Sequence, residues 1–178
     1  MPDNAIAYNV QPLSIADLTD YTTAVAKSFD SLSASVSWVD NHPDPAQGVQ
    51  WVHSRQSMWA AGREYSFAIR TADLSGFLGV CSLNRIDWQH ACGNLNFWTL
   101  ASSQKKGVAT TGAHAVVEFA FQQLKLARVE VLTAHNNRAA QKVARNIGAK
   151  REGLLKDRIL HKNERQDAVL YAAIASRI

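Results

Sequence analysis

The spacing between hydrophobic residues changes twice along the chain, and these two changes limit the folds that the chain can adopt. Apolar side chains recur at helical spacing in 15–28 and 46–62, which predicts two helices. The next part, 65–99, alternates instead, and the turn-forming stretch 73–76 separates two of its runs, so we expect a hairpin and a third strand. Helical spacing returns at residue 108. Antiparallel strands that lead into helix-containing units indicate a mixed sheet.

The opening and closing segments complete the expected element order. Four further strands are expected, at 8–13, 129–134, 149–160 and 166–175. The pair Ser14–Asp17 predicts a capping box at the first helix, and a later helix at 140–147 ends at Gly148. By contrast, 30–45 is rich in Ser, Asp and Pro and predicts an irregular loop. We therefore expect one domain over residues 1–178, with α+β and α/β character mixed: a largely antiparallel sheet of about seven strands and helices on both faces.

Composition fits a single globular domain without a membrane span. The 178 residues are 47% hydrophobic and 19% charged, and no apolar run approaches the ~18 residues that would cross a bilayer. The start, residues 1–4, lacks the features of a signal peptide, so we expect a cytoplasmic protein. Cys81 and Cys92 show no zinc-type spacing, and the six histidines form no metal-binding pair. We therefore expect neither a metal site nor a disulfide.

Positive charge is concentrated in the second half of the chain. The net charge is +4, yet residues 1–54 contain a single Lys or Arg, whereas 104–165 contain thirteen. An excess of this size does not predict direct binding to nucleic acid. Its location suggests an anionic ligand or partner in the second half, although a solvated charged face would have the same composition.

The segment before the helix at residue 108 has the composition of an anion-binding loop. Gln104, Lys105, Lys106 and Gly107 stand directly before a helix start, where unpaired backbone N–H groups carry partial positive charge. Gly107 permits a positive φ or a close approach of the backbone, and Ala109 keeps the first turn accessible. The glycines of a P-loop or a dinucleotide fingerprint are missing. The alternative is a solvated polar turn before a surface helix.

The pattern Gln-x-x-Gly-x-Ala at 104–109 resembles the pyrophosphate loop of the GNAT acyl-CoA N-acyltransferases. Further stretches resemble the RimJ/RimL branch of that superfamily, the ribosomal-protein N-terminal acetyltransferases. These stretches are Gly79–Ile86, Trp98, Asn137, Asn146–Leu155, Asp167 and Tyr171. The resemblance covers roughly residues 10–174. It implies the GNAT fold and an N-acetyltransferase of the EC 2.3.1 class that uses acetyl-CoA as co-substrate and transfers acetyl directly to a primary amine.

The same resemblance implies which residues contact each substrate. Acetyl-CoA is expected to lie along the third strand of the hairpin region, the loop and the starts of the next two helices. Its expected contacts are Trp98, Thr99, Leu100, Gln104, Lys105, Lys106, Gly107, Val108, Ala109, Thr110 and Asn137. Trp38 and Trp51 are expected at the entrance of the amine acceptor.

Two positions depart from the family pattern and leave the proton-transfer groups unassigned. Ala140 stands where the family usually has a Ser that protonates the departing thiolate, and Asn94 stands where an acidic residue is common. Tyr171 is the remaining candidate for the acid. As bases, Glu64, Asp87 or a histidine could approach in space.

The absence of an evident base favours an acceptor that is already partly neutral. An α-amino group with a pKa near ~7.8 is about one-third neutral at pH 7.5, whereas a lysine is only about 0.1% neutral. We therefore expect an N-terminal α-amino group as the acceptor, and the resemblance to the RimJ/RimL branch implies that it belongs to a ribosomal protein. Two alternatives stay open: a small amine such as an antibiotic or polyamine, and a non-catalytic acyl-CoA-binding module. A homodimer is also left open.

Overall fold

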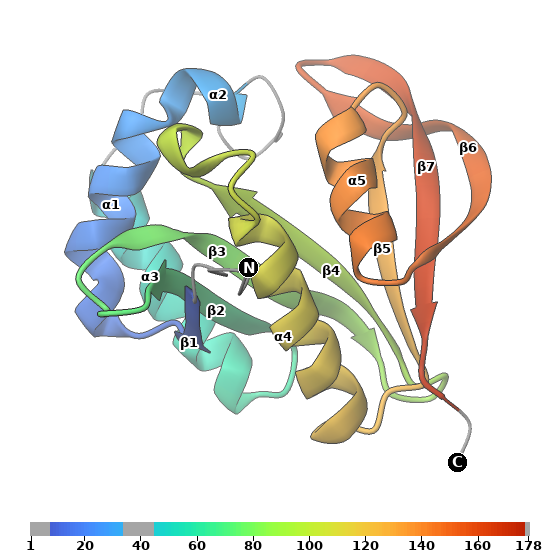
Figure 1. The fold of residues 1–178 in the computed structure, drawn as a ribbon, viewed down its shortest axis with the longest axis horizontal. Coiled ribbons are helices and arrows are strands. Elements are labelled where there is room, and N and C mark those ends of the chain that lie inside the picture. The colour runs from blue at the N-terminus through green and yellow to red at the C-terminus, as the bar shows by residue number, and fades with distance from the viewer. Residues whose placement is uncertain (1–7, 34–44, 177–178) are drawn as a thin grey trace, which may run out of the picture.

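The computed structural model describes residues 8–33 and 45–176, and in this part of the chain seven strands form one sheet (Figure 1). The strands are β1 (Tyr8–Pro12), β2 (Tyr65–Thr71), β3 (Phe77–Asp87), β4 (Cys92–Thr99), β5 (Arg128–Ala134), β6 (Lys150–His161) and β7 (Glu164–Ile174). Their order in the sheet is β1-β2-β3-β4-β5-β7-β6. Every neighbouring pair is antiparallel except β4 and β5, which are parallel. The expected mixed, largely antiparallel sheet is thus confirmed.

Helices cover both faces of this sheet, as the sequence predicts. They are α1 (Leu18–Lys27), α2 (Phe29–Ser33), α3 (Pro45–Ala60), α4 (Val108–Gln122) and α5 (Arg138–Asn146), with 3₁₀ turns at Ile15–Asp17 and Ala101–Ser103. α4 and α5 pack on one face, and α1 and α3 pack on the other. Among the described residues, no helix is both long and apolar enough to cross a membrane.

The short helix α2 corrects one expectation. Residues 30–45 were expected to form an irregular loop, but 30–33 belong to α2, and the structure does not describe 34–44. The reason is a local apolar pair that the polar composition of the stretch obscures. Phe29 and Leu32, three positions apart, both pack against the core beneath α1, and Leu32 is buried.

Side chains alternate between two cores on opposite faces of the central strands. Ile69 and Cys81 face α4, whereas Ala68 and Val80 face α1 and α3. α4 lies very close to the sheet at Gly112, where an added Cβ would stand 2.4 Å from Cδ1 of Ile69. A side chain at position 112 would force Ile69 or the helix to shift, so the glycine permits this close approach.

The strands β4 and β5 separate along their length, and this separation shapes the molecule. Their ladder contains only the pairs Cys92↔Arg128, Gly93↔Val129 and Asn94↔Glu130. Beyond that point β4 continues to residue 99 and β5 to residue 134 without pairing to each other (Figure 1). Each strand keeps its partner on the other side, β3 for β4 and β7 for β5. The sheet therefore opens at its centre.

Two β-bulges lie on either side of this opening. In β3 the ladder with β4 shifts between Asn84 and Asp87, and Arg85 adopts a φ of +48°. In β6 the ladder with β7 shifts between Leu155 and Ile159, and Asp157 adopts a φ of +49°. Bulges of this kind redirect the side chains of the bulged strand.

Candidate active site

The opening between β4 and β5 forms a cleft of about 750 Å³. One wall comes from β4, with Leu95, Asn96, Phe97 and Trp98. The other wall comes from β5 and the start of α5, with Val131, Leu132, Thr133, Ala134, Asn136, Asn137 and Ala140. Because β4 and β5 do not pair here, their facing backbone groups can bond to an extended ligand that carries amides.

The loop that leads from β4 into α4 is held in place from two sides. Gln104 donates from Nε2 to Oγ of Ser31 at 3.0 Å, and the hydroxyl of Tyr8 donates to the carbonyl oxygen of Lys106 at 2.8 Å. Gln104 to Gly107 are exposed, and the first N–H groups of α4 follow directly. The loop therefore presents backbone donors, two lysines and a helix start to solvent in one fixed shape.

Gly107 has a conformation that only glycine adopts readily. It is the N-cap residue of α4 with a φ of +85°, in the left-handed region. An added Cβ would meet nothing within 4 Å, so the space above the residue is open. The glycine is thus needed for the turn of the backbone, and the turn leaves room for a bulky group at the helix start.

Asn137 caps α5 and lines the cleft at the same time. Its Oδ1 accepts a hydrogen bond from the backbone N–H of Ala140 at 3.0 Å. Its Nδ2 has no partner among the described residues, and both Asn137 and Ala140 belong to the cleft wall. The side chain therefore uses its oxygen for the helix and keeps a donor for a ligand.

Of the other three expected site residues, one lines the cleft, one lies away from it, and one is not among the described residues. Trp51 lies in the cleft wall, stacked on Tyr21 with ring centroids 4.6 Å apart, while Trp38 is outside the described residues. Tyr171 is buried beneath α5, where its hydroxyl accepts from Arg145 at 3.2 Å and donates to Gln141 at 3.4 Å. Tyr171 is not among the residues that line the cleft.

Of the bases that the sequence left open, Glu64 and one histidine, His161, line the cleft, and Asp87 does not. Glu64 bonds to Arg55 at 2.6 Å and accepts from the hydroxyl of Ser66 at 3.0 Å. Ser66 in turn shares a 2.7 Å hydrogen bond with Ser82. Asp87 instead bonds to His90 on the surface, an interaction that lowers the pKa of its carboxyl. The wall of the cleft therefore carries a carboxylate that an arginine neutralises.

Polar side chains on β3 and β4 also line the cleft, and sequence reasoning singled out Asn94 among them but not Ser82, Asn84 or Asn96. Asn94 donates to Asn84 at 3.0 Å and to Asn96 at 3.3 Å. Ser82 lies directly opposite Asn96 in the ladder. A signal was present, because polar residues recur at every second position in strands that otherwise carry core residues. The position that is often acidic in the family is here an amide in a network of amides.

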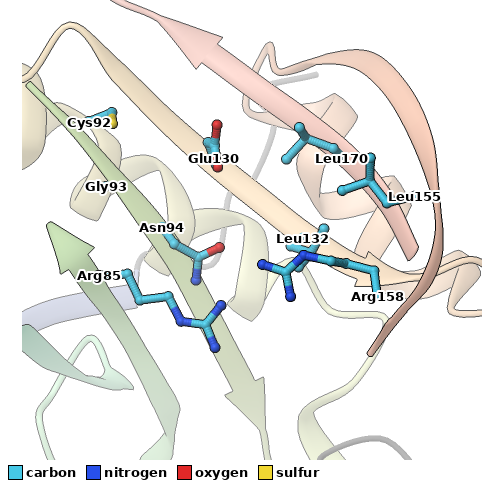
Figure 2. A pocket seen from close by; sticks show the side chains of 9 residues that line it. All are labelled: Arg85, Cys92, Gly93, Asn94, Glu130, Leu132, Leu155, Arg158 and Leu170. Carbon is cyan, nitrogen blue, oxygen red and sulfur yellow. The ribbon is translucent and has the colours of Figure 1, made fainter. Parts of the chain in front are cut away.

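A smaller cavity of about 140 Å³ continues the cleft at its closed end, where β4 and β5 still pair (Figure 2). Its lining residues are Arg85, Cys92, Gly93, Asn94, Glu130, Leu132, Leu155, Arg158 and Leu170. Four of these, Arg85, Asn94, Leu132 and Arg158, also line the cleft. Within the described part of the chain, no three His, Cys, Asp or Glu side chains gather in a way that would hold a metal ion.

Comparison with known proteins agrees with this geometry. The family model described as "Acetyltransferase (GNAT) domain" matches residues 9–150, which is most of the chain. The chain belongs to the GNAT acetyltransferase family. It is therefore an N-acetyltransferase by family, and acetyl-CoA is the acetyl donor that this family uses.

Individual relatives of this GNAT chain are distant. It is 26% identical over 96 residues to the putative ribosomal N-acetyltransferase YdaF of Bacillus subtilis, a match that covers 54% of this chain and 52% of that protein. The chain thus spans about half the length of this curated relative.

Solved structures share the fold over almost the whole chain. One is RimL, a ribosomal L7/L12 alpha-N-protein acetyltransferase in complex with coenzyme A, with a TM-score of 0.88, 18% identity and coverage of 95% of this chain and 96% of that one. Another is the ribosomal-protein-S5-alanine acetyltransferase from Vibrio fischeri, with a TM-score of 0.85, 16% identity and coverage of 94% and 92%.

Proposed function

We propose that this protein transfers acetyl from acetyl-CoA directly to the N-terminal α-amino group of a protein, with a ribosomal protein as the favoured acceptor. The observation that carries the proposal is the separation of β4 from β5 next to the anion-binding start of α4. The ribosomal assignment is supported by relatives whose names describe acetyltransferases of ribosomal proteins. The transfer would be direct, without a covalent enzyme intermediate, if the cleft holds the acetyl donor and the amine together.

The donor side of the reaction rests on backbone groups. The loop before α4 would bind the diphosphate through its N–H groups, with Lys105 and Lys106 adding charge. The free edge of β4 would pair with the amides of the pantetheine arm, and Nδ2 of Asn137 would donate to the same arm from the opposite wall. A backbone N–H of β4 near Trp98 would polarise the thioester carbonyl, as in other acyl-transfer sites.

The acceptor side of the reaction follows from the polar side chains that β3 and β4 add to the cleft. The amine would enter past Trp51, attack the carbonyl carbon with its lone pair, and displace the sulfur as a thiolate. The amine needs no protein base before the attack, because an α-amino group is already partly neutral near pH 7.5. Once the N–C bond has formed, the nitrogen would release its surplus proton to water in the open cleft. Ala140 offers no hydroxyl to the thiolate, so we expect slow turnover rather than none.

A second candidate is a non-catalytic acyl-CoA-binding module, which Ala140 and the amide network around Asn94 favour. Release of coenzyme A thiol, measured with N-terminal peptides of ribosomal proteins, with a polyamine and with an aminoglycoside, separates the candidates. Acetylation of a peptide α-amine supports the proposal. Acetylation of the small amines alone would replace it, and tight binding of acetyl-CoA without turnover on any acceptor would favour the binding module.

A further inference from the structure

We propose that Arg85 and Arg158 form a binding site for an anionic group that the acceptor carries beside its amine, specifically the side-chain carboxylate of an acidic residue that follows a protein N-terminus. The proposal rests on the proposed function for the amine itself. It adds the substrate class, which neither the family nor the comparisons supply.

The two arginines approach one another from opposite sides of the opened sheet. Figure 2 shows the side chain of Arg85 extending from β3 and that of Arg158 extending from β6, and Asn94 and Leu132 line the same cavity. Both line the smaller cavity and also the cleft, so they stand where the two spaces join. A ligand in the cleft could therefore place one group between the two guanidinium groups.

The carboxylates that line the two spaces do not pair with either arginine. Arg85 and Arg158 are exposed, and neither has an ion pair or side-chain hydrogen bond with another described residue. The acidic residue of the smaller cavity, Glu130, already bonds to Arg128 at 2.8 Å. The acidic residue of the cleft, Glu64, is paired with an arginine as described above. Two converging guanidinium groups without partners match a carboxylate or phosphate, which accepts several charge-assisted hydrogen bonds.

The backbone is shaped to aim these side chains. Arg85 itself occupies the left-handed position of the β3 bulge, a conformation that costs energy for a residue with a side chain. Arg158 follows the left-handed Asp157 in the β6 bulge, which Asp167 holds through Lys156 at 2.7 Å and through the N–H of Asp157 at 3.2 Å. Both bulges therefore point an arginine into the opening.

The anion bound here is not a phosphate of the donor. The loop that would bind the diphosphate follows Thr99, whereas the arginines stand near Asn94, where β4 and β5 still pair. Five residues of strand separate the two places, about 17 Å at ~3.4 Å per residue. In addition, Asn94 and Glu130 lie on the sheet face opposite α4, because Leu95 and Val129 point into the core beneath that helix. The arginine pair therefore belongs to the acceptor side.

A carboxylate near an amine can come from an acidic second residue of a peptide or from the carboxyl group of a free amino acid. We favour the peptide, because the combined opening is larger than a single amino acid requires. The experiment compares peptides beginning Ser-Asp and Ser-Asn that are otherwise identical, together with free serine and serinamide. It measures kcat/KM at saturating acetyl-CoA, and binding to the CoA-loaded protein by calorimetry.

The variants are Arg85→Gln, Arg158→Gln, the double variant and Arg158→Lys, with Arg63→Gln as a control that removes an exposed positive charge outside both spaces. In the wild type we expect the Ser-Asp peptide to be preferred at least tenfold over Ser-Asn, in kcat/KM or in affinity. The double variant should lose that preference, Arg158→Lys should keep part of it, and Arg63→Gln should leave it unchanged. Thermal unfolding checks that each variant is folded.

The outcomes separate this proposal from the proposed function. Equal kcat/KM and equal affinity for Ser-Asp and Ser-Asn in the wild type would overturn the arginine site while the acetyltransferase assignment stands. The wild type could instead prefer free serine over serinamide, lose that preference in the double variant, and show no activity or binding with the peptides. This result would support the anion site but overturn the peptide as the acceptor. If no acceptor is turned over, the binding affinities measured by calorimetry decide. The arginine site would be overturned if Arg63→Gln abolished the preference for the Ser-Asp peptide as fully as the double variant does.

Discussion

At the scale of single residues, Ala140 is the position where one atom should change the rate. Its side chain lies in the cleft wall at the start of α5, so Ala140→Ser would place a hydroxyl in the cleft. We expect kcat to rise by about two- to tenfold, below the ~10²–10⁴-fold of a fully developed general acid, with little change in the KM for acetyl-CoA. Steady-state kinetics with one peptide acceptor measure this effect. The matched control is Ala139→Ser on the exposed side of the helix; an equal gain in both variants would contradict the role of the position.

Asn137 offers a second test at this scale, because its two polar atoms have separate tasks. Asn137→Asp keeps an oxygen for the N–H of Ala140 but removes the amide donor that faces the cleft. We expect an unchanged midpoint of unfolding, since Asp caps helices as well as Asn. The KM for acetyl-CoA should rise about fivefold, the equivalent of one hydrogen bond of ~1 kcal/mol. Asn163→Asp, in the exposed turn between β6 and β7, controls for the added charge, and an unchanged KM would make Asn137 a cap alone.

At the scale of elements, the turn into α4 should tolerate only glycine at its last residue. An added Cβ at Gly107 meets no atom within 4 Å, but a β-branched residue at a φ of +85° forces the loop into another shape. Calorimetry should show the affinity of Gly107→Val for coenzyme A falling at least tenfold, about 1.4 kcal/mol. An added Cβ at Gly153 also meets no atom within 4 Å, and its φ is not left-handed, so Gly153→Val should leave the affinity unchanged. A folded Gly107→Val variant with normal affinity would show that the diphosphate binds elsewhere.

A buried ion pair joins the start of α1 to β2, and it should be a sensitive point of stability. Asp17 is 2% exposed; its carboxylate accepts from Arg70 at 2.6 Å through one oxygen and from the N–H of Ser14 at 2.8 Å through the other. Removing one partner of a buried pair typically costs ~3–5 kcal/mol, so Asp17→Ala should lower the free energy of unfolding in urea by about 3 kcal/mol. Asp20→Ala removes the half-exposed second partner of Arg70 and should cost at most about 1 kcal/mol. Similar losses in the two variants would contradict this account.

The sequence predicts elements well where their determinants are local. The starts of α3 and α4, the hairpin and the loop at 104–107 follow from short patterns, and the structure contains each of them, whereas the start of α2 was not predicted. The polar surface on which we expect the acceptor to bind could not be predicted. It depends on the register that sets Ser82 opposite Asn96 and on the bulge that redirects Arg85. Register and bulges are set by contacts between distant segments, which no local pattern contains.

At the scale of the whole molecule, the ligand should bind along the two strand edges that lack a partner. Coenzyme A that bridges β4 and β5 would slow amide hydrogen exchange in 95–99 and 131–134, with little effect on β1. At a concentration 100 times its Kd it should also raise the free energy of unfolding by about 2.7 kcal/mol. Hydrogen exchange followed by mass spectrometry measures the first effect, and thermal unfolding measures the second. Protection confined to α4 would show that the ligand contacts the loop without entering the cleft.

The three residue pairs between β4 and β5 also have a mechanical consequence. They are the ladder that connects one half of the sheet, β1 to β4, to the other half, β5 to β7. α4, which contacts both β3 and α5, spans the join on one face. The chain can thus be regarded as two lobes joined at Asn94, and a small rotation of one lobe against the other would change the width of the gap at its open end. A substrate laid along both edges would fix that angle, so the spacing that the chemistry requires would be set in part by the molecule that reacts.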